Sequence, residues 1–227
     1  MKLKTRPALK AQVQPISAVI MTGIVVSLVG VAYFWGVPLI QKRASMSEFQ
    51  SMERFIEDLK DKVSEIARSG AGEVTLEIKH GFIRLNPYNH PTEGDAKGGN
   101  NLTIEFVVDQ PLIFPGTVLY LGATSFEDIK DTGTYGESSP AVVKLNSSKL
   151  GQQYRITTEI KYRELLKEAA PRRGYIIALC PLRDDGCSQT ITGNQRITLS
   201  FDKNVQKTGE ASNGGDLVVT YINVELV

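Results

Sequence analysis

Two cysteines are the residues of this sequence whose chemistry is easiest to interpret. Cys180 and Cys187 enclose the string PLRDDG, in which Asp-Asp-Gly can turn the chain back on itself. Two cysteines this close in an exported domain most often form a disulfide. The alternatives are two free thiols or half of a metal site, and the sequence has no second cysteine pair to complete zinc coordination. The spacing therefore favours a disulfide, and we expect no metal.

Candidate catalytic residues form no convincing set. His80 and His90 lack cysteines or carboxylates at the tight spacing that a metal site needs. The triplet Asp131-Thr-Gly is similar to the catalytic loop of aspartic proteases, in which two carboxylates share one proton. Here Lys130 precedes the triplet, no second copy exists, and a turn is the favoured interpretation. The sequence thus predicts neither an enzyme nor a cofactor.

Two sequons are candidate glycosylation sites. Asn101-Leu-Thr and Asn146-Ser-Ser both match the acceptor pattern, and both lie at predicted boundaries between a loop and a strand. The pattern is short enough to occur by chance. The two asparagines therefore agree with an exported domain without requiring one.

A hydrophobic helix is predicted over residues 16–40. Its string, ISAVIMTGIVVSLVGVAYFWGVPLI, has no charge, and the uncharged run extends from Ala11 to Gln41. Crossing the roughly 30 Å hydrocarbon core of a bilayer takes about 20 apolar helical residues. In lipid, a single segment satisfies its backbone only as a helix. We therefore expect residues 16–40 to lie in a membrane at some stage.

Three glycines recur along this helix, at Gly23, Gly30 and Gly36. Small residues let helices approach closely in transmembrane contacts. Gly23 and Gly30 are seven residues apart and so lie near one helix face. One interpretation is a surface that packs against copies of the same helix. The other is a plain anchor with ordinary glycines, and this feature alone favours the anchor.

A second helical pattern covers residues 45–69. Its apolar residues recur at spacings of three and four, opposite a charged face, and Gly70 is expected to end the helix. The stripe consists of Phe49, Met52, Ile56, Leu59, Val63 and Ile66. A free two-stranded coiled coil is usually longer. We expect the stripe to pack on the chain's own domain, and residues 12–70 to form one long helix.

The N-terminal residues carry a resemblance to a known family. Residues 1–11 are a short basic leader that ends in Lys10-Ala11, and Gln12, Gln14 and Pro15-Ile16-Ser17 lead into the uncharged helix. This arrangement resembles the class III signal peptide and N-terminal helix of archaeal type IV pilins. The resemblance implies that a prepilin peptidase cleaves near Lys10, Ala11 and Gln12. It also implies that the helix passes from the membrane into the core of an extracellular filament.

Residues 71–227 change to short alternating strands with turn-rich links. This region is large enough for one domain with its own core. The expected strands are 73–79, 82–85, 102–108, two short strands within 112–121, 142–145, 154–160, 175–180, 196–201 and 217–226. One helix is expected over residues 161–170, where KYRELLKEAA precedes Pro171. The fold class is therefore α+β, a long helix followed by a mainly antiparallel, sandwich-like domain.

The sequence thus leads to two functional hypotheses. The first is a non-enzymatic subunit of an archaeal type IV pilus-like filament, whose partners are the membrane, other pilin subunits and a prepilin peptidase. The second is a single-pass membrane anchor that holds the β-domain outside the cell as a binding module. The chain has 26 basic and 25 acidic residues, so nothing indicates a nucleic-acid partner. In both hypotheses the domain faces outward and supplies adhesion or another surface contact.

Overall fold

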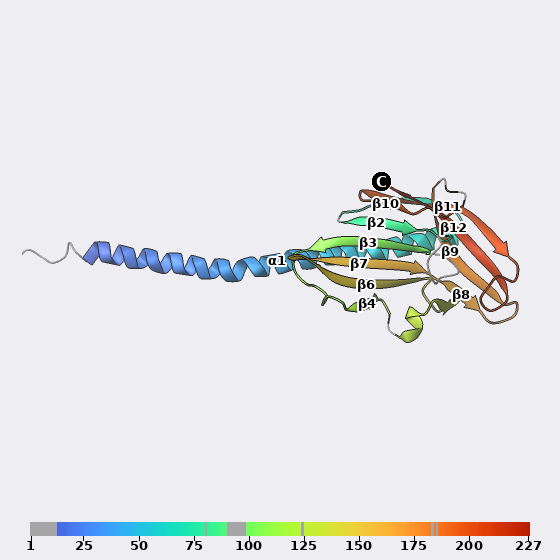
Figure 1. The fold of residues 1–227 in the computed structure, drawn as a ribbon, viewed down its shortest axis with the longest axis horizontal. Helices are drawn as coiled ribbons and strands as arrows, with labels where there is room; N and C mark the ends of the chain where they lie inside the picture. The colour runs from blue at the N-terminus through green and yellow to red at the C-terminus, as the bar shows by residue number, and fades with distance from the viewer. Residues whose placement is uncertain (1–12, 80, 90–98, 124, 183, 185) are drawn as a thin grey trace, which may run out of the picture. The chain divides into compact units, whose positions relative to one another are not determined.

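The computed structural model describes residues 13–79, 81–89, 99–123, 125–182, 184 and 186–227. The leader, residues 10–12 of the expected cleavage region, and both histidines lie outside these residues. The chain divides into two compact units with the boundary after Ala44. Figure 1 shows the order of the elements along the chain.

One helix, α1 (Val13–Ser69), contains both predicted helical segments. Its last turn carries Arg68, a favourable place for a cation at a helix C-terminus. Gly70 comes next with a φ of +65°, and its N–H donates to the Ile66 carbonyl at 3.1 Å. The left-handed backbone at Gly70 ends the helix. Glycine suits this position because it adopts the conformation without the steric cost of a side chain.

Two six-stranded sheets make up the β-rich part of the described chain. Sheet A contains, in spatial order, β1 (Glu73–Glu77), β11 (Arg196–Lys207), β12 (Asp216–Leu226), β9 (Arg173–Pro181), β8 (Glu164–Lys167) and β5 (Thr132–Thr134). Sheet B contains β10 (Ile191–Gly193), β2 (Phe82–Asn86), β3 (Asn101–Val108), β7 (Gln153–Tyr162), β6 (Ala141–Leu150) and β4 (Val118–Leu121). A short 3-10 helix, η2 (Phe126–Ile129), precedes β5.

Neighbouring strands in both sheets run mainly antiparallel. Only the pairs β12–β9 and β5–β8 are parallel among the described strands. The predicted α+β class, a long apolar helix followed by a mainly antiparallel domain, is therefore confirmed. In Figure 1, the part of α1 within residues 45–69 lies along β3 and β7 of sheet B.

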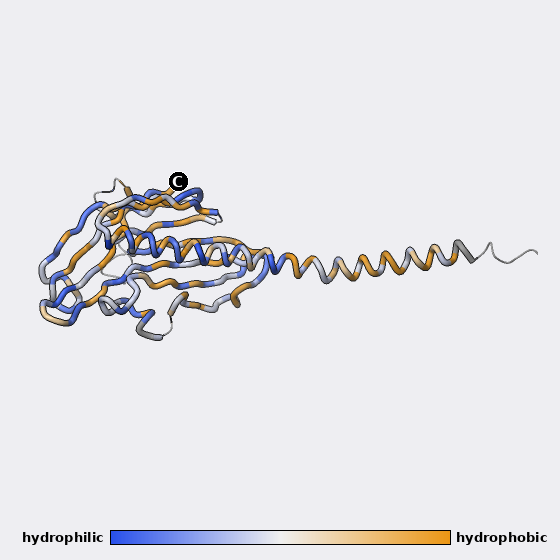
Figure 2. The backbone as a smooth tube through the Cα atoms, turned by 180° about the vertical axis from the view of Figure 1, so that it is seen from behind, coloured by the Kyte–Doolittle hydropathy of each residue, from blue (hydrophilic) through white to orange (hydrophobic). Residues whose placement is uncertain are grey.

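The stripe of α1 lies in the main core of the domain. Met52, Ile56, Leu59, Val63 and Ile66 are all buried and share one apolar cluster with residues of both sheets. The strands of sheet B supply alternate residues to it, as the period of a half-buried strand requires. These are Ile83, Leu85, Leu102, Ile104, Phe106, Val108, Val143, Leu145, Ile156 and Ile160. Figure 2 colours the backbone by hydropathy, and hydrophobic residues recur along the strands of the domain.

A second, smaller core covers the opposite face of sheet A. On β9, Ile177 and Leu179 join the main core, whereas Ile176, Ala178 and Cys180 join the second cluster. β9 is thus buried on both faces, as its unbroken apolar run YIIALC suggests. The remaining members of the second cluster are Tyr88, Cys187, Ala211, Leu217 and Val219.

Residues 45–227 contain a complete core. They form one compact unit, and the buried apolar residues of the described chain begin at Met52. The stripe side of α1 belongs to this unit, so its core needs no residue from the preceding segment. We therefore expect residues 45–227 to fold as an independent domain.

The helix predicted over residues 161–170 is wrong. β7 continues to Tyr162, which pairs with Ala141, and β8 begins at Glu164. Between them, the buried Arg163 donates from Nε to the Ser139 carbonyl and from Nη1 to the Lys130 carbonyl. Good helix formers fill this string, but strand pairing and burial outweigh an intrinsic preference of a few tenths of a kcal/mol per residue, roughly.

Two further predictions differ from the structure. Only β4 forms within residues 112–121, so the first of the two expected short strands is absent from this described stretch. The Asp-Thr-Gly triplet does not form a turn, because Thr132 and Gly133 enter β5 and pair in parallel with β8. Sequence pattern missed this pairing because β8 itself lies in the segment that was predicted to be helical.

Candidate functional site: the apolar surface of the N-terminal helix

The first half of α1 presents a continuous apolar surface. Except for the partly buried Val37, its large apolar side chains over residues 16–40 are between 53% and 81% exposed. They are Ile16, Val19, Ile20, Met21, Ile24, Val25, Val26, Leu28, Val29, Val31, Tyr33, Phe34, Trp35, Leu39 and Ile40. A large exposed apolar patch marks a contact with a membrane or another protein. The helix is long and apolar enough to cross a membrane.

Two polar side chains within this surface, those of Thr22 and Ser27, are satisfied by the helix itself. Thr22 donates from Oγ1 to the Ala18 carbonyl, and Ser27 donates from Oγ to the Gly23 carbonyl, both at 2.8 Å. A hydroxyl that bonds the carbonyl four residues earlier needs no water. Burial of this helix in lipid or among other helices therefore leaves neither hydroxyl donor unpaired.

The glycines leave three flat places on the same surface. A Cβ atom built on Gly23, Gly30 or Gly36 would meet no other atom within 4 Å. Gly23 and Gly30 are thus free of contacts within the chain, and a second helix could approach their backbone closely. The structure gives these three glycines no role inside the domain.

The two halves of α1 differ in the contacts that their apolar side chains make within the chain. Leu59 and Val63 of the stripe are 0% exposed, and Phe49 at its start packs against the same core. The stripe is therefore occupied by the chain's own sheets. Only the segment 16–40 retains an apolar face for a membrane or for other copies of the helix.

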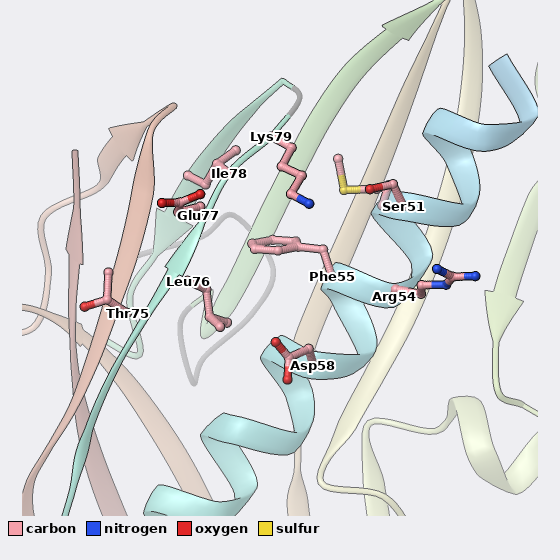
Figure 3. A pocket seen from close by; sticks show the side chains of 10 residues that line it. Ser51, Arg54, Phe55, Asp58, Thr75, Leu76, Glu77, Ile78 and Lys79 are labelled. Atoms are coloured by element: carbon pink, nitrogen blue, oxygen red, sulfur yellow. The ribbon is translucent and has the colours of Figure 1, made fainter. Parts of the chain in front are cut away.

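A groove of about 570 Å³ lies between α1 and the edge strand β1. Figure 3 shows Phe55 projecting from α1 toward the strand. Met52, Leu76 and Ile78 supply further apolar walls, and Asp58 is among the charged lining residues. The remaining lining residues are Ser51, Arg54, Thr75, Glu77 and Lys79. The lining of this groove therefore mixes apolar side chains with polar and charged ones.

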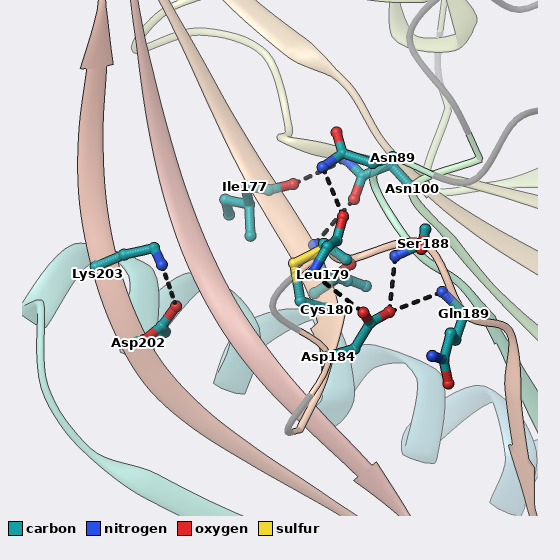
Figure 4. Close-up of a disulfide and its surroundings, with 12 residues drawn as sticks. Asn89, Asn100, Ile177, Leu179, Cys180, Asp184, Ser188, Gln189, Asp202 and Lys203 are labelled. Carbon is teal, nitrogen blue, oxygen red and sulfur yellow. Dashed lines mark hydrogen bonds and ion pairs between the residues drawn. A yellow bond between two sulfur atoms is a disulfide. The ribbon is translucent and has the colours of Figure 1, made fainter.

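Cys180 and Cys187 form a disulfide that fixes the loop after β9. Both residues are buried in the second core. The backbone N–H of Asn89 donates to the Cys187 carbonyl at 3.0 Å, and the Asn89 amide donates to the Gly186 carbonyl. The loop is thereby joined to the segment that follows β2. Figure 4 shows this arrangement.

Asp184 organises the same loop through its carboxylate. The backbone N–H groups of Gln189, Ser188 and Gly186 donate to it at 2.8, 2.8 and 3.1 Å. These hydrogen bonds favour the ionised form, so the pKa of Asp184 lies below its ordinary value. The carboxylate has a structural task here and is not poised for acid–base chemistry.

Removing the disulfide is expected to destabilise the domain measurably. The closed loop is short, so the chain-entropy estimate for its loss is about 2–3 kcal/mol. In a domain of this size, that corresponds to a fall in the melting temperature of roughly 5–10 °C. The test compares the melting temperature of fragment 45–227 with that of its Cys180→Ala/Cys187→Ala variant. Free thiols in the native mass spectrum of the unmodified fragment would contradict the bridge.

Asn100 is a structural residue that sequence reasoning missed. It is 3% exposed and has a φ of +41°. Its amide Nδ2 donates to the carbonyls of Tyr162 and Ile177 at 3.1 and 2.8 Å. Its Oδ1 accepts from the Leu179 N–H at 3.0 Å. One side chain thus joins the end of β7 in sheet B to β9 in sheet A. The only signal in the sequence was an asparagine after two glycines, which is typical of a left-handed position.

The remaining candidates are separate from one another. Asp131 is largely exposed and forms an ion pair with Lys161 at 3.1 Å, which differs from a proton-sharing carboxylate pair. No group of three or more potential metal ligands occurs among the residues that the structure describes. Asn101 begins β3, and its amide donates to Glu159 at 2.7 Å, whereas Asn146 is exposed. Asn146 lies within β6, so its predicted position at a strand boundary is wrong.

Comparison with known proteins identifies no relative. No family model matches the chain, and no curated protein or solved structure matches it. The class of protein is therefore defined by the structure alone. It is an α+β chain with a long apolar N-terminal helix and a domain of two mainly antiparallel sheets.

Proposed function

We propose that this protein is a non-enzymatic structural subunit of a type IV pilus-like filament of the archaeal kind. The observation that supports this proposal most directly is that the two halves of α1 differ in burial. Residues 16–40 are apolar on an exposed surface, while the stripe from Met52 to Ile66 is buried in the domain core. A helix of this kind can first lie in a membrane and then bundle with identical helices.

Processing of the N-terminus is the second part of the proposal. A prepilin peptidase would remove residues 1–11, which carry Lys2, Lys4, Arg6 and Lys10. Loss of these charges would let the helix start enter an apolar bundle, because an unpaired charge is costly in such surroundings. The β-domain would then face outward and supply adhesion or another surface contact.

The N-terminal sequence of the native protein tests this proposal directly. Protein from the sheared surface fraction is expected to start at Gln12 or within a residue or two of it. Recovery of an intact Met1 leader, with all of the protein in the membrane fraction, would refute the filament. The chain would then be a single-pass anchor that holds the β-domain outside the cell, for which the length and apolarity of α1 suffice.

Enlarging the helix glycines is expected to block assembly while sparing membrane insertion. Gly23→Leu and Gly30→Leu each place a bulky side chain where backbones would meet. Leucine raises both helix propensity and apolarity, so insertion should be unaffected. A loss of about 1.4 kcal/mol per contact lowers association tenfold. We therefore expect roughly tenfold less protein in sheared filaments for each variant.

The matched control for this experiment is Val25→Leu, on the helix face opposite Gly23 and Gly30. It adds one methylene at an apolar position of the same exposed surface, where the side chain is already large. Total and membrane-bound protein are measured by immunoblot beside the filament fraction. Normal filament yield from both glycine variants would exclude these glycines from the contact between helices.

A further inference from the structure

Strand β4 leaves one backbone edge of sheet B open. It is the last strand in the order of the sheet and pairs with β6 on one side only. An edge strand carries a row of N–H and C=O groups that can accept another strand. Its other side therefore offers backbone hydrogen bonds that the described part of the domain does not use.

The side chains of β4 are apolar and unusually exposed for a strand. Val118, Leu119 and Tyr120 are 42%, 43% and 38% exposed, and Phe114 just before them is 85% exposed. Leu121 alone packs against the main core. Exposed apolar edges are normally covered or interrupted by charges and prolines. β4 has neither within its four residues.

Charge distinguishes β4 from the edge of sheet A at β1. The stretch from Pro111 to Ser125 contains no charged residue. In contrast, β1 begins and ends with the exposed residues Glu73 and Glu77. Two copies of β1 brought edge to edge would carry like charges into one contact, which is unfavourable. Two copies of β4 would meet without that repulsion.

We propose that β4 of one molecule pairs with β4 of a second copy, so that their two B sheets join edge to edge. An antiparallel pair of identical strands satisfies a two-fold axis, and the contact is self-complementary. A second copy fits better than a lipid surface, because hydrocarbon leaves open backbone groups unsatisfied. The exposed apolar side chains of β4 and Phe114 become covered in the same step.

The contact depends only on residues 45–227 and not on the membrane helix. It therefore holds or fails independently of the proposed filament. In a filament, such a two-fold contact would link subunits of neighbouring fibres, because head-to-tail contacts build the fibre itself. In a membrane-retained protein, it would make dimers of the outward domain.

Self-association of fragment 45–227 tests the proposal. Sedimentation equilibrium from about 1 μM to 1 mM covers weak to moderate affinities. We expect a monomer–dimer equilibrium for the unmodified fragment and a dissociation constant at least tenfold higher for Val118→Lys. Lysine on an edge strand is a common natural block to pairing. Val118 lies opposite the neutral, exposed Asn146, so the fold should accept the charge.

Asn204→Lys is the matched control. Asn204 is exposed on β11 of sheet A, opposite the neutral Thr220, so this variant adds the same charge away from the open edge. It should dimerise like the unmodified fragment. Equal weakening by both lysines would overturn the proposal, as would an unmodified fragment that remains monomeric over the whole range.

Hydrogen exchange of the unmodified fragment gives a readout that needs no variant. Amides of residues 118–121 should become more protected as the concentration rises, whereas those of β1 should not change. Protection that appears elsewhere and spares β4 would place the contact on another surface and refute the pairing.

Discussion

Replacing Leu59 with alanine is expected to destabilise the domain by about 3–5 kcal/mol. Leu59 is 0% exposed and lies at the centre of the α1 stripe, within the core shared by both sheets. Truncation removes apolar contact and leaves a cavity that the surrounding strands fill only in part. Domains of this kind have a total free energy of unfolding of about 5–15 kcal/mol, so the loss is a large share of it.

Urea unfolding of fragment 45–227, followed by circular dichroism, measures this effect. Glu57→Ala is the control, because Glu57 is exposed on the same helix and its loss should change stability by no more than about 0.5 kcal/mol. A similar small loss for both variants would mean that the stripe does not seal the core. It would then be available for contacts between subunits.

Replacing Asn100 with glycine is expected to cost about 3–5 kcal/mol, because three buried backbone groups lose their partner. These groups are the carbonyls of Tyr162 and Ile177 and the N–H of Leu179. Glycine accepts a φ of +41° without strain, so Asn100→Gly isolates the contribution of the amide. The measurement is again urea unfolding of fragment 45–227.

A nearly isosteric variant, Asn100→Asp, sharpens this test. An ionised carboxylate still accepts from the Leu179 N–H but presents its second oxygen to two carbonyl oxygens, which repel it. The folded state therefore favours the protonated acid and raises its pKa above the unfolded value. Stability is then greatest below the unfolded pKa and falls as the pH rises through the folded pKa. If the variant were as stable as the parent at neutral pH, the hydrogen bonds that the Asn100 amide donates would not stabilise the domain as proposed.

The long helix could be predicted because two patterns are visible directly in the sequence. Residues 16–40 are mainly apolar and carry no charge, and the stripe from Phe49 to Ile66 repeats at the spacing of one helix face. Both patterns are local. Most strands were predictable for the same reason, since alternation in segments such as Leu102 to Val108 needs only neighbouring residues.

The segment KYRELLKEAA shows where local patterns fail. Its residues prefer a helix when considered alone, yet it contains the end of β7 and the whole of β8. Arg163 lies between these strands, with its guanidinium bonded to carbonyls of Ser139 and Lys130. The contacts of Arg163 and the pairing of β8 with β5 join residues more than twenty positions apart, and no short window of sequence contains them.

The sequence by itself therefore determined the apolar helix, its amphipathic continuation and the strand-rich character of residues 71–227. Tertiary structure alone decided three other features. It placed the stripe inside a core of two sheets, gave Asn100 its partners on β7 and β9, and left β4 as an open apolar edge. The physical reason is that periodicity is set by adjacent residues, whereas burial, hydrogen-bond partners and strand order depend on segments that meet only after folding.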